Sequence, residues 1–266
     1  MTDLGSFDTD HQYSVRKIVT IWLLATVPMF ILGWLIPPII GDSWGMEVGL
    51  ARSILLTLGL AWMTLLSLAI VYQEEGDFAW ATIKKRLRLN APRDPKTGET
   101  RRRLWWWLVP VSLVFGVEAL LLDGLIAQPL LDGPLSFMAE PDRYSLDAFA
   151  QDQSRLAPLK GAWWLFAIFI PLLAFNILGE ELLFRGVLLP KMNGAFGRVA
   201  WIANGIVSTL YHVHQPSTFL LGVFVAPLVF ALPAYRFRST AMSMLIHGAQ
   251  VPIILLLVLG IVLGVV

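Results

Sequence analysis

The sequence predicts an all-α, polytopic membrane protein with about seven transmembrane helices and an intramembrane site. The composition is 56% hydrophobic with a mean hydropathy of +0.67, which exceeds the roughly half-apolar usage of soluble domains. Several apolar runs approach the length of about 20 residues that a helix needs to cross a bilayer. Tryptophans cluster at the ends of these runs, as in interfacial aromatic belts. The 266 residues include no cysteine, which excludes disulfides, thiolate metal sites and cysteine nucleophiles.

Seven segments are predicted to span the membrane. They cover residues 18–40, 54–72, 104–122, 163–189, 199–214, 218–235 and 241–263. The fifth segment is short, and the third could continue toward Leu131, which would raise the count to eight. The first run exceeds the apolar core of a secretory signal and is predicted to be retained. Residues 1–162 form the predicted N-terminal helices with a basic cytoplasmic loop, and residues 163–266 form the region with unusual polar side chains.

The distribution of charge predicts the orientation. Nine Lys and Arg residues lie in the loop 73–103, whereas the loops 41–53 and 123–162 are rich in Asp and Glu. Because Lys and Arg collect on the cytoplasmic side, the loop 73–103 and the N-terminus are predicted to be cytoplasmic. We expect an integral protein of a prokaryotic plasma membrane. The same basic loop could also contact anionic lipid.

Ionisable side chains occur inside the apolar runs of the C-terminal region. The stretch FNILGEELLFRG carries Glu180, Glu181 and Arg185, and His212 and His247 lie in later predicted spans. Such groups are costly in a bilayer, so their presence together indicates mutual contact around a shared cavity. Counted from the cytoplasmic ends, the helix rise places Glu180 roughly 13 Å deep, His247 roughly 10 to 14 Å and His212 roughly 20 Å. These depths predict a site that opens to the cytoplasm.

The spacing of the two glutamates predicts different roles. Glu181 and Arg185 are four residues apart and share a helical face, which predicts an ion pair. Glu180 is rotated by about 100° and is free to act as a general base or a metal ligand. A Glu with two His is the ligand set of a catalytic zinc site, so Glu180, His212 and His247 could hold a divalent metal. Alternatively, Glu180 and His212 polarise a water without metal, and His247 donates to the oxyanion.

These residues resemble the motifs of the CPBP family, the CAAX proteases and bacteriocin-processing enzymes, which include the type II CAAX prenyl endopeptidases. The family is marked by EExxxR, FxxxH and HxxxN in three successive transmembrane regions. The first motif is complete here, whereas the second has Ser208 in place of Phe and the third has Val251 in place of Asn. The resemblance covers about residues 163–263. It implies an intramembrane endopeptidase that activates water with Glu180, with metal dependence unsettled.

Three further polar residues accompany the motifs. Val251 has no polar atom, but Gln250 lies three residues after His247 and supplies two donors, so Gln250 is predicted to replace the missing donor. Pro252 should loosen that turn. His214 is expected to be interfacial or to cap a helix, with a fallback role as a ligand. Asn176 is expected to form a hydrogen bond between helices.

Three functions are compatible with this pattern. The first is an endopeptidase that cleaves a membrane-tethered peptide or protein of prenylated or leader type, with the bilayer as the other partner and no nucleic acid. The second is a proteolytically silent scaffold or immunity protein of the same family, which the Val251 departure favours. The third is a proton-coupled transporter, since buried Glu and His also build proton relays. Matching Gly/Pro-broken helices, the usual sign of a transporter site, are not apparent in the sequence.

Overall fold

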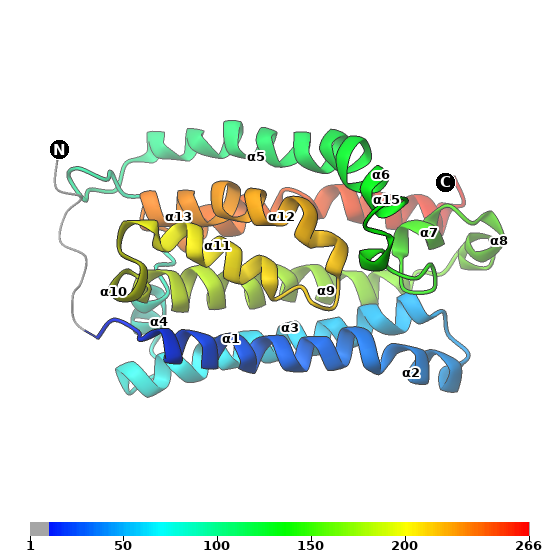
Figure 1. Ribbon diagram of the computed structural model, residues 1–266, viewed down its shortest axis with the longest axis horizontal. Coiled ribbons are helices and arrows are strands. Elements are labelled where there is room, and N and C mark those ends of the chain that lie inside the picture. The colour runs from blue at the N-terminus through cyan, green and yellow to red at the C-terminus, as the bar shows by residue number, and fades with distance from the viewer. Residues whose placement is uncertain (1–10, 266) are drawn as a thin grey trace.

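Long helices lie side by side along the long axis of the molecule (Figure 1). The computed structural model describes residues 11–265. Six helices in this part are long and apolar enough to cross a membrane: Val15–Leu35, Val48–Glu75, Arg102–Leu131, Leu165–Lys191, Pro216–Arg236 and Thr240–Leu263. The described residues contain no strand beyond one isolated bridge between Arg93 and Thr100. The predicted all-α, polytopic membrane fold is confirmed.

The helical elements follow one another closely, and η marks 3-10 or π segments. The first half contains α1 (Val15–Phe30), η1 (Ile31–Leu35), α2 (Pro37–Trp44), α3 (Val48–Glu75), α4 (Trp80–Arg86), η2 (Arg102–Trp107), α5 (Leu108–Val117), η3 (Glu118–Ala127), α6 (Gln128–Leu131), η4 (Ser136–Met138), α7 (Leu146–Ala150), α8 (Gln153–Leu156) and η5 (Ala157–Leu159). The second half contains α9 (Leu165–Glu180), η6 (Glu181–Leu188), η7 (Leu189–Lys191), α10 (Asn193–Phe196), η8 (Gly197–Val199), α11 (Ala200–Leu210), η9 (Pro216–Thr218), α12 (Phe219–Val225), η10 (Ala226–Ala231), α13 (Leu232–Arg236), α14 (Thr240–Gly248) and α15 (Val251–Leu263).

The number of spans differs from the prediction because the segment 199–214 does not cross the bundle. Its helix, α11, has 11 residues. Such a helix rises only about 16 Å, well short of a hydrocarbon core about 30 Å thick. The third segment runs as one helix from Arg102 to Leu131, so it does not divide to give an eighth span. Length and composition therefore support six spans among the described residues.

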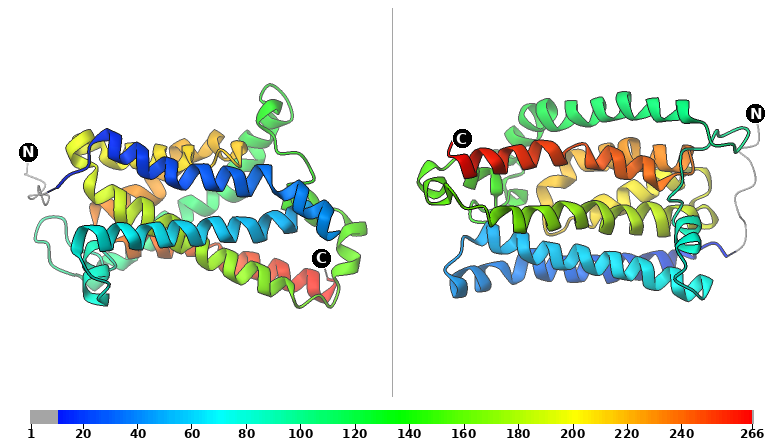
Figure 2. Two further views of the ribbon diagram at one scale, coloured as in Figure 1. Left: turned by 90° about the horizontal axis from the view of Figure 1, so that it is seen from below. Right: turned by 180° about the vertical axis from the view of Figure 1, so that it is seen from behind.

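The two ends of the bundle differ in charge. The basic loop 73–103 with α4 lies at the end where the described chain begins. The acidic segment, residues 123–162 with α6, α7 and α8, lies at the other end (Figures 1 and 2). The helix α5 stands at the rim of the bundle, and none of its residues is buried. The predicted division at residue 162 is not a gap in packing, since α9 packs along α3. The functional division stays a prediction.

Two glycines allow helices to approach closely near the polar residues. A Cβ atom on Gly179 of α9 would lie 2.5 Å from the Leu60 carbonyl oxygen of α3. A Cβ atom on Gly205 of α11 would lie 2.3 Å from the backbone nitrogen of Pro227 in η10. Small residues permit this backbone approach where apolar helices cross in a membrane. The two contacts fix the helices that carry Glu180 and lead to His212.

The guanidinium of Arg52, on α3, joins four segments of the chain. It is 3% exposed, and its Nε donates to the Gly33 carbonyl at 2.9 Å. Its Nη1 and Nη2 form a bidentate pair with Glu140 at 3.1 and 2.8 Å. The same two nitrogens also donate to the carbonyls of Tyr144 at 3.1 Å and His214 at 2.6 Å. All five N–H donors of the side chain are used, so Arg52 serves as a clamp between the acidic segment and the turn after α11.

Labelling of single cysteines tests the orientation of the bundle. The native chain has no cysteine, so Lys96→Cys on the basic loop and Ser136→Cys on the acidic segment each give one exposed thiol. From the Lys/Arg asymmetry, an impermeant maleimide should label Ser136→Cys in intact cells and Lys96→Cys only after permeabilisation. Labelling of Lys96→Cys in intact cells would show that the orientation is the reverse.

Removal of the Arg52 clamp should destabilise the fold. Arg52→Met leaves the Glu140 carboxylate without its partner, and loss of one member of a buried ion pair costs about 3 to 5 kcal/mol. Thermal unfolding in detergent, followed by tryptophan fluorescence, should show a clear decrease in Tm. Arg143→Met is the matched control, because Arg143 lies on the same acidic segment but is exposed. Equal Tm values for the two variants would contradict the clamp.

Candidate functional site

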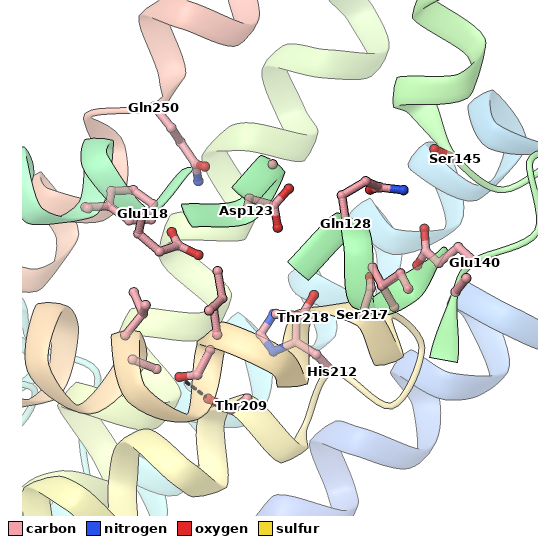
Figure 3. Close-up of a pocket in the computed structure, with 18 of the residues that line it drawn as sticks. Glu118, Asp123, Gln128, Glu140, Ser145, Thr209, His212, Ser217, Thr218 and Gln250 are labelled. Atoms are coloured by element: carbon pink, nitrogen blue, oxygen red, sulfur yellow. Dashed lines mark hydrogen bonds between the residues drawn. The ribbon is translucent and has the colours of Figure 1, made fainter. Parts of the chain in front are cut away.

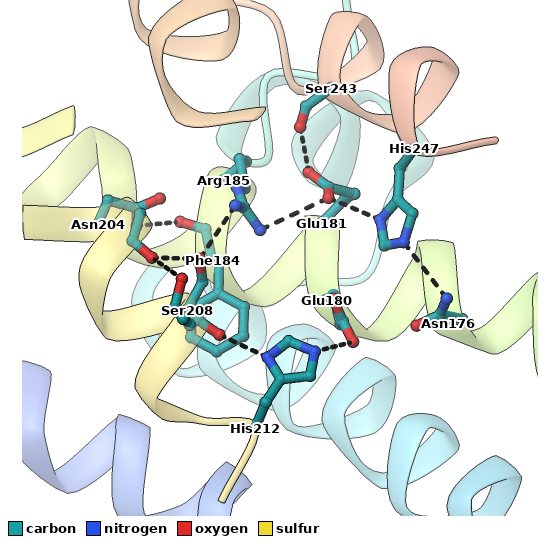
Figure 4. Close-up of polar contacts among 12 residues, drawn as sticks. Asn176, Glu180, Glu181, Phe184, Arg185, Asn204, Ser208, His212, Ser243 and His247 are labelled. Carbon is teal, nitrogen blue, oxygen red and sulfur yellow. Dashed lines mark hydrogen bonds and ion pairs between the residues drawn. The ribbon is translucent and has the colours of Figure 1, made fainter. Parts of the chain in front are cut away.

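The Glu181 carboxylate lies at the centre of a buried polar network (Figure 4). It is completely buried and accepts hydrogen bonds from the Ser243 hydroxyl and, at 3.0 Å, from His247 Nδ1. Arg185 Nη1 lies 3.5 Å from it, which is the ion pair that the four-residue spacing predicts. Arg185 Nη2 also donates to Ser208 Oγ at 3.1 Å. Because both of its oxygens have partners, Glu181 is committed to holding α14 and η6 together.

The motif that carries Glu181 and Arg185 is a π-helix, η6, and not the α-helix assumed from the sequence. A π segment leaves some backbone carbonyls without their usual partners, and such segments are frequent at functional sites. Side chains from other elements bond these carbonyls here. Asn204 Nδ2 donates to the Phe184 carbonyl at 2.8 Å, and Arg86 Nη1 donates to the Gly186 carbonyl at 3.1 Å. The functional segment is therefore held in place by α11 and by α4.

Glu180 faces away from this network and approaches His212. Its side chain is largely buried, and Oε1 lies 3.5 Å from His212 Nε2. His212 Nδ1 lies 3.0 Å from the Ser208 carbonyl, which can only accept, so Nδ1 carries the hydrogen. In a neutral ring Nε2 is then an acceptor, and two acceptors face each other across the cavity. A water that donates one hydrogen to each atom satisfies both.

The ring of His247 has a protein partner on each nitrogen. Nδ1 meets Glu181, and Nε2 lies 3.3 Å from Asn176 Nδ2. A metal ligand needs a free nitrogen lone pair, so the predicted set of Glu180, His212 and His247 does not fit a three-ligand metal site in this arrangement. Among the residues that the structure describes, no group of three or more His, Asp and Glu side chains is placed to hold a metal ion.

Two cavities meet at these residues. The larger has a volume of about 870 Å³ and the smaller about 540 Å³, and both are lined by Glu180, His212, His247 and Gln250. The walls of the larger cavity also carry four carboxylate side chains, those of Glu118, Asp123, Glu140 and Asp142, of which the first three are labelled in Figure 3. The lining of the smaller cavity combines polar side chains, such as that of Arg52, with apolar side chains of α1, α3, α9 and α15, among them Met29, Leu60, Leu173 and Ile254.

The predicted opening toward the basic loop is wrong. The larger cavity is lined by side chains from residues 139–151, and no lining residue comes from the loop 73–103. The physical reason lies at the two ends of the bundle. At the basic end, Leu87 is fully buried and a Cβ atom on Gly186 would lie 3.1 Å from its side chain, so η6 is covered there. At the acidic end, α11 stops early and leaves space beyond His212.

The structure also places the remaining predicted residues. Gln250 lies between α14 and α15 with its amide directed into the cavity (Figure 3), and Val251 begins α15. His214 is buried and not interfacial, and its carbonyl is held by Arg52. Ser208, where the family has Phe, bonds Arg185. Sequence reasoning did not identify Arg52, although an arginine at the edge of the acidic loop 41–53 could have indicated an ion pair at this end of the bundle.

Comparison with known proteins gives one family match. Residues 162–253 match the family model described as Type II CAAX prenyl endopeptidase Rce1-like. No curated protein and no solved structure gives a significant match to the chain. The matched segment contains Glu180, Glu181, Arg185, His212 and His247. Over residues 162–253 the chain therefore carries a domain of the Rce1-like type II CAAX prenyl endopeptidase (CPBP) family.

Proposed function

We propose that this protein is an intramembrane endopeptidase in which Glu180 and His212 activate a water molecule. The observation that carries the proposal is the approach of Glu180 Oε1 to His212 Nε2, at 3.5 Å, where both line a cavity and both lie in the segment that matches an endopeptidase family. Both atoms are acceptors, and both can orient the hydrogens of one water. Glu181 does not compete for this role because its oxygens are bonded to Arg185, Ser243 and His247.

The proposed reaction is hydrolysis of a peptide bond by general base catalysis. Glu180 takes a proton from the water while the water oxygen attacks the carbonyl carbon of the substrate. Negative charge develops on the carbonyl oxygen, and the Gln250 amide is placed to donate to it. The proton on Glu180 then passes to the leaving amine as the C–N bond breaks. The products are a new carboxylate and a new amine, so one water is consumed and no redox partner is needed.

The cavity geometry narrows the substrate class. Glu180 lies inside the bundle, so a peptide must reach it from the bilayer or from the acidic end of the molecule. If Lys and Arg hold the basic end in the cytoplasm, the cavity opens on the outer face of the membrane. A leader-type, membrane-tethered peptide displayed on that face is then the first substrate class to test. Prenylated peptides, which the family name indicates, are the second.

Replacement of the free glutamate should abolish turnover without loss of the fold. Glu180→Gln keeps the size of the side chain but removes the base, and loss of a general base costs about 10²- to 10⁴-fold in rate. Cleavage of a panel of leader-type and prenylated peptides in proteoliposomes, followed by mass spectrometry, measures this decrease. Tm should stay near the wild-type value, since Glu180 lies outside the network around Glu181 and its contact with His212 is long, at 3.5 Å.

Two controls accompany this measurement. Glu118→Gln alters a carboxylate in the same cavity that has no proposed part in activating the water, so turnover should stay at the wild-type level. A chelator of divalent metals should leave wild-type turnover unchanged, since the predicted three-ligand set is not assembled. Undiminished cleavage by Glu180→Gln would refute the assignment of the base, and loss of turnover on chelation would refute water activation without metal.

The role of Gln250 is tested by two substitutions between α14 and α15, one that removes its hydrogen-bond donors and one that adds a donor at the next position. Gln250→Leu removes both amide donors, and loss of one oxyanion donor lowers kcat by about 10²- to 10³-fold. Val251→Asn restores a polar side chain at the next position. If the wild type is inactive on every peptide and Val251→Asn gains turnover, the protein is the proteolytically silent member of the family that the Val251 departure favours. If the wild type is active and Gln250→Leu is equally active, Gln250 is not the donor.

A further inference from the structure

His247 lies between a partner that can only accept and a partner that can only donate. The ionised Glu181 carboxylate accepts from Nδ1 at 3.0 Å, and the Asn176 amide nitrogen, 3.3 Å from Nε2, is a donor. A neutral imidazole has one N–H and one lone pair, so these two contacts together select a single tautomer with the hydrogen on Nδ1. The contact with Glu181 is buried, and the contact with Asn176 is partly buried at the edge of the smaller cavity.

Asn176 belongs to the helix that carries Glu180. It lies four residues earlier on α9, on the same helical face, and it lines the smaller cavity with Glu180, His212 and His247. The hydrogen bond therefore links the helix of the proposed base to the ring on α14 (Figure 4).

We propose that Asn176 is a positioning residue that fixes His247 in the Nδ1–H tautomer and offers its remaining amide hydrogen to the cavity. The first part concerns the ring alone, and the second rests on the proposed function. In this tautomer Nε2 has no hydrogen to give, so His247 cannot donate to the oxyanion from that atom as the sequence suggested. The Asn176 amide has two hydrogens, and no other described residue accepts the second. The donor beside His247 is then Asn176.

The tautomer is measured directly by NMR of ¹⁵N-histidine-labelled protein in lipid nanodiscs. The chain has four histidines, and the His247→Gln variant identifies the signals of this ring. The wild type should show a protonated Nδ1 and an unprotonated Nε2. In Asn176→Leu the Nε2 partner is lost, and a population with hydrogen on Nε2 should appear. In Asn176→Asp, which has the same shape but an acceptor in place of the donor, both nitrogens should become protonated.

Gln250→Leu is the matched control for this spectrum. Gln250 lines the same cavity and also carries an amide, but among the described residues the hydrogen-bond partners of the His247 ring are Glu181 and Asn176, so the His247 signals should not change. In the peptide assay, Asn176→Leu should lower kcat by about 10²-fold with little change in KM, as expected for loss of an oxyanion donor. If Asn176→Leu does not fold, as judged by its Tm, the isosteric Asn176→Asp variant decides.

Two results would overturn the proposal. A wild-type ring with hydrogen on Nε2, or a tautomer that is unchanged in both Asn176 variants, would show that Asn176 does not position His247. Unchanged kcat in a folded Asn176→Leu variant would show that its second hydrogen has no role in the reaction. A wild type without turnover on any peptide would refute the proposed function, while the NMR result would still decide the tautomer.

Discussion

The completely buried carboxylate of Glu181 is the constraint on which the arrangement of the C-terminal helices depends. A carboxylate at membrane depth costs about 3 kcal/mol even on the most lenient insertion scales, unless it is paired and hydrogen-bonded. Arg185 provides the charge from the same helix, and Ser243 and His247 provide donors from α14. The need to satisfy one carboxylate thus brings α14 against η6. This packing sets the position of His247 relative to Glu180 along the long axis of the bundle.

Adjacent glutamates consequently have different environments. Glu181 faces two hydrogen-bond donors and a guanidinium, whereas Glu180 faces a cavity and the His212 imidazole. Environment and not residue type assigns the roles of paired carboxylates at many catalytic sites. The difference arises here from a helical rotation of one residue and from Gly179, which seats the helix directly on the α3 backbone. A side chain in place of Gly179 would push Glu180 away from the turn that holds His212.

The sequence was sufficient for features that depend on composition and local spacing. Apolar runs predicted the long helices, and the four-residue spacing predicted the Glu181–Arg185 pair. It was insufficient where long-range contacts decide. The early end of α11, the π-helix at Glu181 and the pairing of His247 with Glu181 and Asn176 depend on neighbours that hydropathy does not reveal. The direction of the cavity was mispredicted because depth along a helix does not show which end of the bundle the connecting segments cover.

The intrahelical position of the Glu181–Arg185 pair has a consequence for biosynthesis. Chains are made and inserted from the N-terminus, so α9 and η6 enter the bilayer ahead of the segments that carry His212 and His247. At that stage Glu181 already has its counter-ion four residues away, and α3 is present to receive Gly179. Glu180 receives its partner His212 from the later chain, as Glu181 receives its donors on α14. The order of synthesis therefore gives Glu181 its counter-ion first, and the contact between Glu180 and His212 forms afterwards.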